Sequence, residues 1–319
     1  MMGQTAGHST SILRAAAAGV AAFALAACKG ESPTEPVEPY PYDIVVERRE
    51  GLTGPPDLYV LDLATGEERR LFTSASVRGM HPYGSPDGER VAFVRTDNEF
   101  SGEIFVANSD GTGLTNLSSH ASIDVMPAWS RAGGRIAFVT DRAGFQDIFV
   151  VNSDGTGLGR LTPADPNGVV TTEWWPAWSP DGQAIAYSST IDGTPDIWTI
   201  TVGAPVVVRT RLTGTDDADH HPTWSHDGAR IAFERRDVNT GESDIVVLTH
   251  TTGVIATIRL AGQQLAPAWS PDGELIAFAS NHEDVAGDLE IYTMRPDGTE
   301  LRRRTDNGTF DLRPTWLLR

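Results

Sequence analysis

The chain has 319 residues, of which 39% are hydrophobic and 21% are charged, so it is too apolar for a disordered chain and long enough to bury a large core. Acidic residues outnumber basic ones by 43 to 25, which gives a formal net charge of −18. No basic stripe interrupts this acidic background, so nucleic acid is excluded as an expected partner. The single cysteine, Cys28, excludes an intrachain disulfide and a CxxC zinc site.

The first segment has the pattern of a lipoprotein signal peptide. Residues 15–27 are apolar and uncharged, a run too short to span a bilayer but typical of the central part of a signal peptide. The run ends in Leu25-Ala26-Ala27-Cys28, which resembles the lipobox of bacterial lipoproteins. The resemblance implies a signal peptide over residues 1–27 and lipid attachment at Cys28, which becomes the new N-terminus. The alternative is an ordinary signal peptide with an incidental cysteine.

The residues after the cysteine predict a location and a tether. Lys29 follows Cys28 where an aspartate would retain a lipoprotein in the inner membrane, so the resemblance implies the outer membrane, facing the periplasm. Four prolines between residues 29 and 42 favour extended polyproline II and exclude a helix. We therefore expect residues 28–42 to form a semi-rigid tether; a proline-rich ligand for another domain is the alternative.

One sequence unit recurs six times in the remaining chain. Its clearest examples are WPAWSPDGQAIAY from Trp175 and APAWSPDGELIAF from Ala266, and a truncated copy, RPTWLLR, closes the chain from Arg313. Successive motif prolines are 45 to 49 residues apart; they are Pro82, Pro127, Pro176, Pro222, Pro267 and Pro314. A period of this length with short β-like segments predicts the blade of a β-propeller.

Each unit predicts four strands, which we call A to D. Strand A contains Pro-x-Trp-Ser, a Pro-Asp-Gly turn follows, and strand B is an apolar run such as Ile136 to Val139. Strand C opens with an acid, and Asp-Gly turns lead to strand D. The first unit lacks strand A and the C-terminal copy has nothing else, so the two ends are expected to complete one blade and close the ring.

The repeat PAWSPDGxxIAF…DIYxxxxDG…RLT resembles the propeller repeat of the TolB family over residues 43–319. This resemblance implies an all-β, six-bladed β-propeller with four antiparallel strands per blade. TolB proteins also carry an N-terminal α/β domain, for which this sequence has only the tether. We therefore expect a lipoprotein form without that domain, and a role in the Tol–Pal system is not carried over.

Some positions depart from the repeat. Gly84 stands where the other units have tryptophan, Arg131-Ala132-Gly133 replaces Pro-Asp-Gly in one turn, and His226 replaces proline in another. We interpret these departures as tolerated variation. The motif tryptophans are interpreted as packing between blades, and the acids that open strand C as structural rather than catalytic.

The candidate site lies where the D–A loops reach the channel. GxSxG, HExxH, EF-hand and P-loop motifs are absent from the sequence, so we assign no catalytic residue. Strand A is expected to be innermost, which brings the residue before each motif proline to the channel mouth. The candidate ligand-binding residues are His81, Trp174, Trp175, Asp219, His220, His221 and Arg313.

Two clusters among these residues leave alternatives open. Residues 216–221 read DDADHH, which could ligate a divalent cation or form a solvated acidic loop. Trp174 and Trp175 could stack on a sugar ring or anchor a peptide, or they could plug the ring or pack on the neighbouring blade.

The intact ring and the missing catalytic motifs favour a binding module for an envelope protein or peptide, attached to the membrane by its lipid and without a cofactor. The alternative is a carbohydrate-active or metal-dependent enzyme, a lyase or hydrolase with its site in the central channel. It is motivated by a resemblance to oligogalacturonate lyases, TolB-like propellers whose channel histidines hold a divalent cation. A purely structural surface lipoprotein is a third hypothesis.

Overall fold

The computed structural model describes residues 41–51, 53–74, 76–98, 101–163, 170–282 and 287–319. The predicted signal peptide, Cys28 and the tether up to residue 40 lie outside the described residues. Within the described ranges, no helix has the length and hydropathy needed to cross a membrane.

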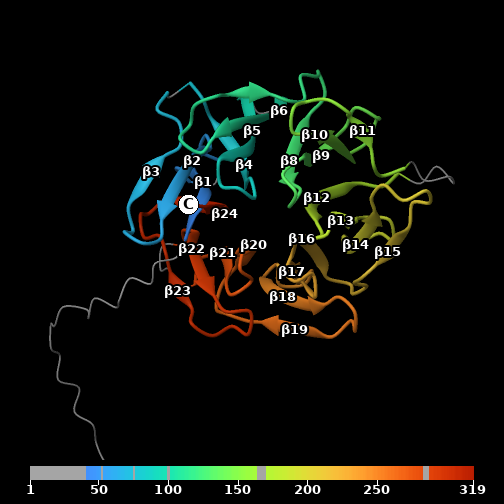
Figure 1. Cartoon of the computed structure of the whole chain (residues 1–319). Helices are drawn as coiled ribbons and strands as arrows, with labels where there is room; N and C mark the ends of the chain where they lie inside the picture. The colour runs from blue at the N-terminus through green and yellow to red at the C-terminus, as the bar shows by residue number, and fades with distance from the viewer. Residues whose placement is uncertain (1–40, 52, 75, 99–100, 164–169, 283–286) are drawn as a thin grey trace, which may run out of the picture. The chain divides into compact units, whose positions relative to one another are not determined.

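The described residues form six four-stranded antiparallel sheets that follow one another around a central axis (Figure 1). This arrangement confirms the predicted all-β, six-bladed propeller. Blade 1 contains β24 (Phe310–Leu318), β1 (Tyr42–Arg49), β2 (Asp57–Asp62) and β3 (Glu68–Arg70). Blade 2 contains β4 (Gly79–Gly84), β5 (Arg90–Asn98), β6 (Ser101–Asn108) and β7 (Thr115–Asn116). Blade 3 contains β8 (Asp124–Trp129), β9 (Arg135–Thr140), β10 (Asp147–Asn152) and β11 (Gly159–Arg160).

The other three blades repeat this order. Blade 4 contains β12 (Glu173–Trp178), β13 (Ala184–Ser189), β14 (Asp196–Thr201) and β15 (Arg209–Arg211). Blade 5 contains β16 (Ala218–Trp224), β17 (Arg230–Arg236), β18 (Ser243–Thr249) and β19 (Ile255–Ile258). Blade 6 contains β20 (Gln264–Trp269), β21 (Ile276–Ser280), β22 (Glu290–Met294) and β23 (Arg302–Arg303). The predicted strands A are therefore β24, β4, β8, β12, β16 and β20.

The ring closes through the two ends of the folded chain. Strand β24 pairs antiparallel with β1, and Trp316 lies opposite Ile44 in the register. The C-terminal copy of the motif thus supplies the inner strand of the first blade, as the sequence predicts. Closure in this way leaves β1 without an open edge.

Burial decreases from the inner strands to the outer ones. In blade 3, every residue of β9 from Ile136 to Thr140 is buried, whereas both residues of β11 are exposed. Strand B is covered on both faces because each sheet is sandwiched between two other blades, which explains its continuous apolar sequence. The short, polar outer strands protect the sheet edges.

Six hydrophobic clusters fill the spaces between neighbouring blades, and five of them contain a motif tryptophan. The guanidinium of Arg135 in blade 3, for example, lies 4.5 Å from the ring centre of Trp178 in blade 4. The predicted packing role of these tryptophans is confirmed. The cluster between blades 1 and 2 has no tryptophan and includes Leu317 instead.

The acids that open strand C bind the adjacent strand D. Asp147 pairs with Arg160 at 2.8 Å, and Asp57 pairs with Arg70 at 2.7 Å. The Thr162 hydroxyl also donates to Asp147 and accepts from the backbone N–H of Ile148. These contacts hold the outer strand on the blade, which confirms the structural interpretation of these acids.

Candidate functional site

The residue before each motif proline has a left-handed backbone conformation in all six blades. Their φ angles lie between 49° and 56°; the residues are His81, Met126, Trp175, His221, Ala266 and Arg313. None of them is glycine, although this region of φ is costly for residues with a Cβ atom. Six recurrences at one repeat position show that the strand, rather than the particular side chain, imposes this geometry.

This conformation produces a bulge in the inner strand. In blade 4 the register between β12 and β13 shifts between Trp174 and Ala177, and the inner strands of the other blades shift at the equivalent place. A bulge re-aims the side chains that it contains. Here it presents the side chain that precedes each proline to the channel, and all six of these residues line one cavity.

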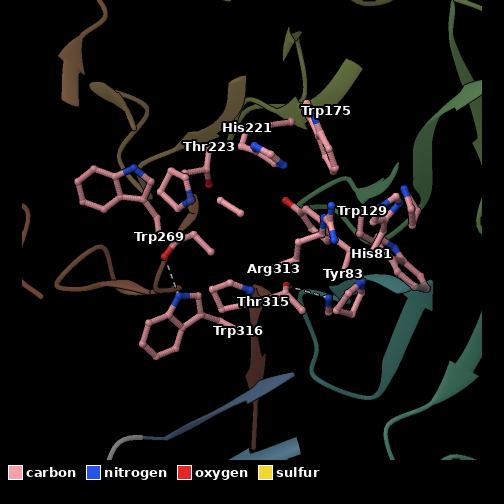
Figure 2. Close-up of a pocket in the computed structure, with 18 of the residues that line it drawn as sticks. His81, Tyr83, Trp129, Trp175, His221, Thr223, Trp269, Arg313, Thr315 and Trp316 are labelled. Carbon is pink, nitrogen blue, oxygen red and sulfur yellow. Dashed lines mark hydrogen bonds between the residues drawn. The ribbon is translucent and has the colours of Figure 1, made fainter. Parts of the chain in front are cut away.

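The cavity occupies the central channel and has a volume of about 210 Å³. Its wall runs along the six inner strands from the pre-proline residues to the A–B turns, where Pro86, Arg131 and Pro271 line it. Figure 2 shows labelled side chains from different blades converging on this space. The described residues of the D–A loops do not contribute to the wall, so the cavity extends away from the mouth that the sequence suggested.

The six residues that precede the motif prolines form a circle around the channel, which we call the pre-proline ring, and Trp175 makes the most aromatic contacts described in it. Its ring centre lies 3.8 Å from that of His221, and 5.2 Å from that of His81, which meets it edge to face. The Arg313 guanidinium lies 5.3 Å from the same indole. Residues of blades 1, 2 and 5 therefore pack around one tryptophan of blade 4 (Figure 2).

Two buried glutamates stand behind this ring at equivalent positions of strand B. Glu47 in β1 accepts hydrogen bonds from Arg313 at 3.1 Å and from the backbone N–H of His81 at 3.0 Å. Glu234 in β17 lies 3.0 Å from Nδ1 of His221 and accepts from the backbone N–H of Ala266 at 3.2 Å. Each carboxylate thus joins the pre-proline residue of its own blade to that of the next blade.

Burial and these contacts set the protonation states. Burial alone would raise the pKa of Glu47, but Arg313, His81 and Arg49 outweigh it and hold the pKa at about 2. Burial, with a further contribution from Arg313, lowers the pKa of His81 to about 3, and burial also lowers the pKa of His221. At neutral pH the ring therefore contains an ionised Glu47–Arg313 pair and two uncharged imidazoles.

Two of the departures from the repeat, Gly84 and Arg131, line the opposite end of the cavity, and the third, His226, contacts Arg131 there. Nη1 of Arg131 in blade 3 lies 2.7 Å from Nδ1 of His226 in blade 5, so these two substituted turns meet. A Cβ atom on Gly84 would lie 2.3 Å from the backbone oxygen of Trp316, so the closing strand requires glycine there. Close approach explains Gly84, and direct contact links Arg131 with His226, so these departures are more than neutral variation.

Comparison with known proteins identifies the family. A family model for the TolB beta propeller domain matches residues 52–174 and 221–318, which together exceed half of the chain. The chain belongs to the TolB beta-propeller domain family.

This TolB-type propeller is similar to longer proteins. It is 31% identical over 106 residues to the Protein TolB homolog of Chlorobium luteolum, which covers 33% of this chain and 23% of that protein. It is 29% identical over 286 residues to Dipeptidyl-peptidase 5 of Porphyromonas gingivalis, which covers 71% of this chain and 41% of that protein. The chain therefore spans less than half the length of these curated relatives.

Among solved structures, TolB from Acinetobacter baumannii matches with a TM-score of 0.70 and 21% identity, covering 86% of this chain and 66% of that one. At this identity the likeness supports the fold alone.

The TolB-type channel brings together only some of the residues singled out in the sequence. His81, Trp175, His221 and Arg313 line the cavity, whereas Trp174, Asp219 and His220 do not. The Trp174 indole N–H donates to Gln146 of blade 3, and its ring lies 6.3 Å from that of His220. Binding by Trp174, Asp219 or His220 stays a prediction from sequence.

Asp219 belongs to a set of buried inner-strand residues two positions before the pre-proline residue. It is fully buried, and Arg235 donates to both of its carboxylate oxygens, at 2.7 and 2.8 Å. In blade 1 the equivalent Asp311 accepts from Arg48 at 2.6 and 2.7 Å. The bulge separates these acids from the channel, and each holds its inner strand to strand B of the same blade.

Sequence reasoning missed Glu47, Glu234 and Arg131. The signal for the glutamates was present, because each interrupts an apolar strand B at the same repeat position. Among the described residues, no group of three or more histidine, cysteine, aspartate or glutamate side chains is arranged to hold a metal ion. The cavity instead combines indole, imidazole and guanidinium groups, which suit stacking and the binding of anions.

Proposed function

We propose that this TolB-type propeller is a lipid-anchored binding module of the bacterial cell envelope that takes a peptide segment of a protein partner into its central channel. The observation that carries the proposal is the cavity of about 210 Å³ whose wall combines side chains from all six blades. Rigid strands present these groups, and their types differ between blades, as expected where a scaffold recognises an irregular ligand.

The chemistry of the wall supports a peptide. Trp175 and Arg313 are residue types that dominate binding energy at protein interfaces, and they are already in contact in the free protein. The cavity is smaller than the roughly 300–1,000 Å³ of sites for drug-sized ligands, so it suits a chain end or a few side chains better than a long polymer. A preorganised ring also reduces the entropy lost on binding.

The proposed binding is tested with the full-length chain in detergent and a displayed library of random peptides. The variant Trp175→Ala/His221→Ala should weaken the binding of selected peptides by roughly tenfold or more, because it removes a central aromatic anchor. The matched control, Asp110→Asn/Asp154→Asn, changes two C–D turns away from the cavity and should leave affinity unchanged. Failure to select any peptide, or loss of binding only in the control, would contradict the proposal.

The anchoring and the envelope location rest on residues 15–27 and on Cys28. Cys28→Ala should move the protein from the membrane fraction to the soluble fraction after a salt wash, as followed by immunoblotting. Cys28→Ser is a second variant that keeps the side-chain size. If both variants remain entirely with the membranes, lipid attachment at this residue is not the anchor.

One observation supports a second candidate, an enzyme with its site in the same channel. Nδ1 of His221 lies 3.0 Å from a carboxylate oxygen of Glu234, and both ring nitrogens are buried without a hydrogen bond of regular geometry in the described part of the chain. A carboxylate close to an imidazole is an arrangement used for general-base chemistry. A hydrolase and lyase screen on acidic glycans and peptides, with His221→Gln as the control, tests this candidate.

A further inference from the structure

The ionisable groups that line the cavity have an unusual balance of charge. They are two arginines, two histidines and a tyrosine, namely Arg131, Arg313, His81, His221 and Tyr83. None of the described lining residues carries a carboxylate. This absence contrasts with a chain that has a net charge of −18.

The two arginines differ in how their charge is balanced. Arg313 lies 3.1 Å from the buried carboxylate of Glu47, so its charge is largely met within the protein. Arg131 forms no ion pair within 4.0 Å among the described side chains, and its closest polar contact is the ring nitrogen of His226 at 2.7 Å. An imidazole nitrogen positions the guanidinium but supplies no negative charge.

The position of Arg131 in the repeat places it in an A–B turn. The equivalent A–B turn residues are Pro86, Pro180 and Pro271 in blades 2, 4 and 6, and His226 in blade 5. Proline is therefore compatible with the turn. Among the five blades that have an A–B turn, only blades 3 and 5 lack this proline, and the side chains that replace it contact each other. Arg131 lines the cavity at the A–B end, so it borders the space that a ligand would fill.

We infer that the A–B end of the channel recognises a carboxylate of the bound peptide through Arg131, with His226 as a positioning residue. This inference rests on the proposed peptide-binding function. A guanidinium presents a planar fork of donors that matches a carboxylate in a two-point contact. The carboxylate is either the C-terminus of the peptide or an acidic side chain, since both offer the same two oxygens.

The pre-proline end and the A–B end then bind different parts of the peptide, which fixes the orientation of the peptide in the channel. The apolar part of the peptide packs on Trp175 and its carboxylate reaches Arg131 at the opposite end. Negative charge elsewhere on the protein repels acidic peptides from other surfaces, so this one cation supplies specificity as well as affinity.

The test uses the full-length protein in detergent and short random peptides in defined pools. One pool has a free C-terminus and no aspartate or glutamate, a second has an amidated C-terminus with these residues, and a third has neither carboxylate. Trigalacturonate is a fourth probe, because it carries carboxylates on sugar rings.

Affinities are measured by isothermal titration for the wild type, Arg131→Gln, Arg131→Pro and Arg259→Gln. Arg131→Pro restores the residue of blades 2, 4 and 6 and so guards against a folding defect, and Arg259→Gln removes an exposed charge away from the cavity.

We expect the pool without carboxylates to bind roughly tenfold or more weakly than at least one carboxylate pool. Both Arg131 variants should abolish that preference, whereas Arg259→Gln should change affinity by less than about twofold. The first two pools distinguish the chain terminus from a side chain. Equal binding of all three pools, or a preference that survives both Arg131 variants, overturns the inference and leaves the proposed function standing. Binding of trigalacturonate without binding of any peptide pool overturns both.

Discussion

The two ends of the central channel are built from the same six inner strands, yet they differ in how their charges are satisfied. At the pre-proline end, buried carboxylates meet the arginine and a neighbouring histidine, and aromatic contacts close around Trp175. At the A–B end, Arg131 lines the cavity with the ring nitrogen of His226 as its closest polar contact. The repeat thus fixes the scaffold at both ends, while single substitutions decide which end offers a cationic side chain without a carboxylate partner.

The pre-proline end also connects neighbouring blades through buried carboxylates, which the A–B end does not do in the described part of the chain. Glu47 and Glu234 each connect two successive blades through a side chain and a backbone N–H. Changes to these two glutamates should therefore alter stability, whereas changes to Arg131 should alter binding.

Deleting residues 313–319 should abolish cooperative folding. The deletion removes most of β24, exposes β1 as an edge and takes away Trp316, whose loss alone costs about 3–5 kcal/mol. That is a large share of a typical stability of about 5–15 kcal/mol. Circular dichroism during thermal unfolding measures the effect. Deletion of residues 318–319 alone is the control and should be mild, because Trp316 stays; a full deletion that melts within about two degrees of the parent would contradict closure by this strand.

Replacing the two glutamates should show that they are not equivalent. Glu47→Gln leaves Arg313 and Arg49 without their carboxylate and should cost about 3 kcal/mol or more. Glu234→Gln faces the uncharged His221 and the hydroxyl of Ser243, so about 1 kcal/mol is expected. Urea denaturation at neutral pH gives both values. Equal losses would show that the charge of Arg313 does not distinguish the two positions.

The repeat made the fold predictable, and it did so for physical reasons. Six copies of one pattern fixed the strand order, and complementary ends fixed the closure that β24 and β1 display. The repeated tryptophans could be assigned to packing and the strand C acids to a structural role, because a residue type that recurs in most blades has the same role in each of them. A single short apolar segment can be read as a strand or as part of a helix, and the recurrence of the same pattern in every unit removed this ambiguity.

The site was less predictable because it depends on what differs between copies. The left-handed bulge at His221 and its equivalents separates the preceding residue from the channel, and no propensity signals such a bulge before proline. Placing Asp219 beside the channel was therefore an assumption of regular strand geometry, which the bulge breaks. The contact between Arg131 and His226 joins residues 95 positions apart, and only the curvature of the ring brings them together.

The pre-proline end should also make stability depend on pH. Glu47 has a pKa of about 2 in the folded protein against an ordinary value of 4.5, so its stabilisation is complete above pH 4.5 and is lost as the pH falls toward 2. The loss should reach roughly 3 kcal/mol. His81, with a pKa of about 3 against 6.5, adds to the loss, because the unfolded chain takes up the proton first as the pH falls below 6.5.

Urea denaturation across this pH range measures the effect. Glu47→Gln should flatten the part of the profile below pH 4.5, and His81→Gln should flatten the part that begins near pH 6.5. Arg131→Gln should leave the shape of the profile unchanged, since its end of the channel holds neither group. A wild-type profile that is flat from pH 7 to pH 3 would contradict the ionisation states assigned to the ring.

The smallest predicted effect concerns the backbone of the pre-proline ring and compares two alanines of β20. Ala266 has a φ of 49°, which costs about 1–2 kcal/mol for a residue with a Cβ atom, whereas Ala268 lies outside the left-handed region. Glycine at either position loses a methyl contact and adds unfolded-state entropy, together about 1–2 kcal/mol. For Ala266→Gly the relief of strain offsets this loss, so the urea midpoint should hardly move; Ala268→Gly has no such relief and should be destabilised by the full amount. If Ala266→Gly instead lowers the stability more than Ala268→Gly does, the left-handed conformation is not strained. Side-chain packing, and not the geometry of the inner strands, would then hold the pre-proline residues in place.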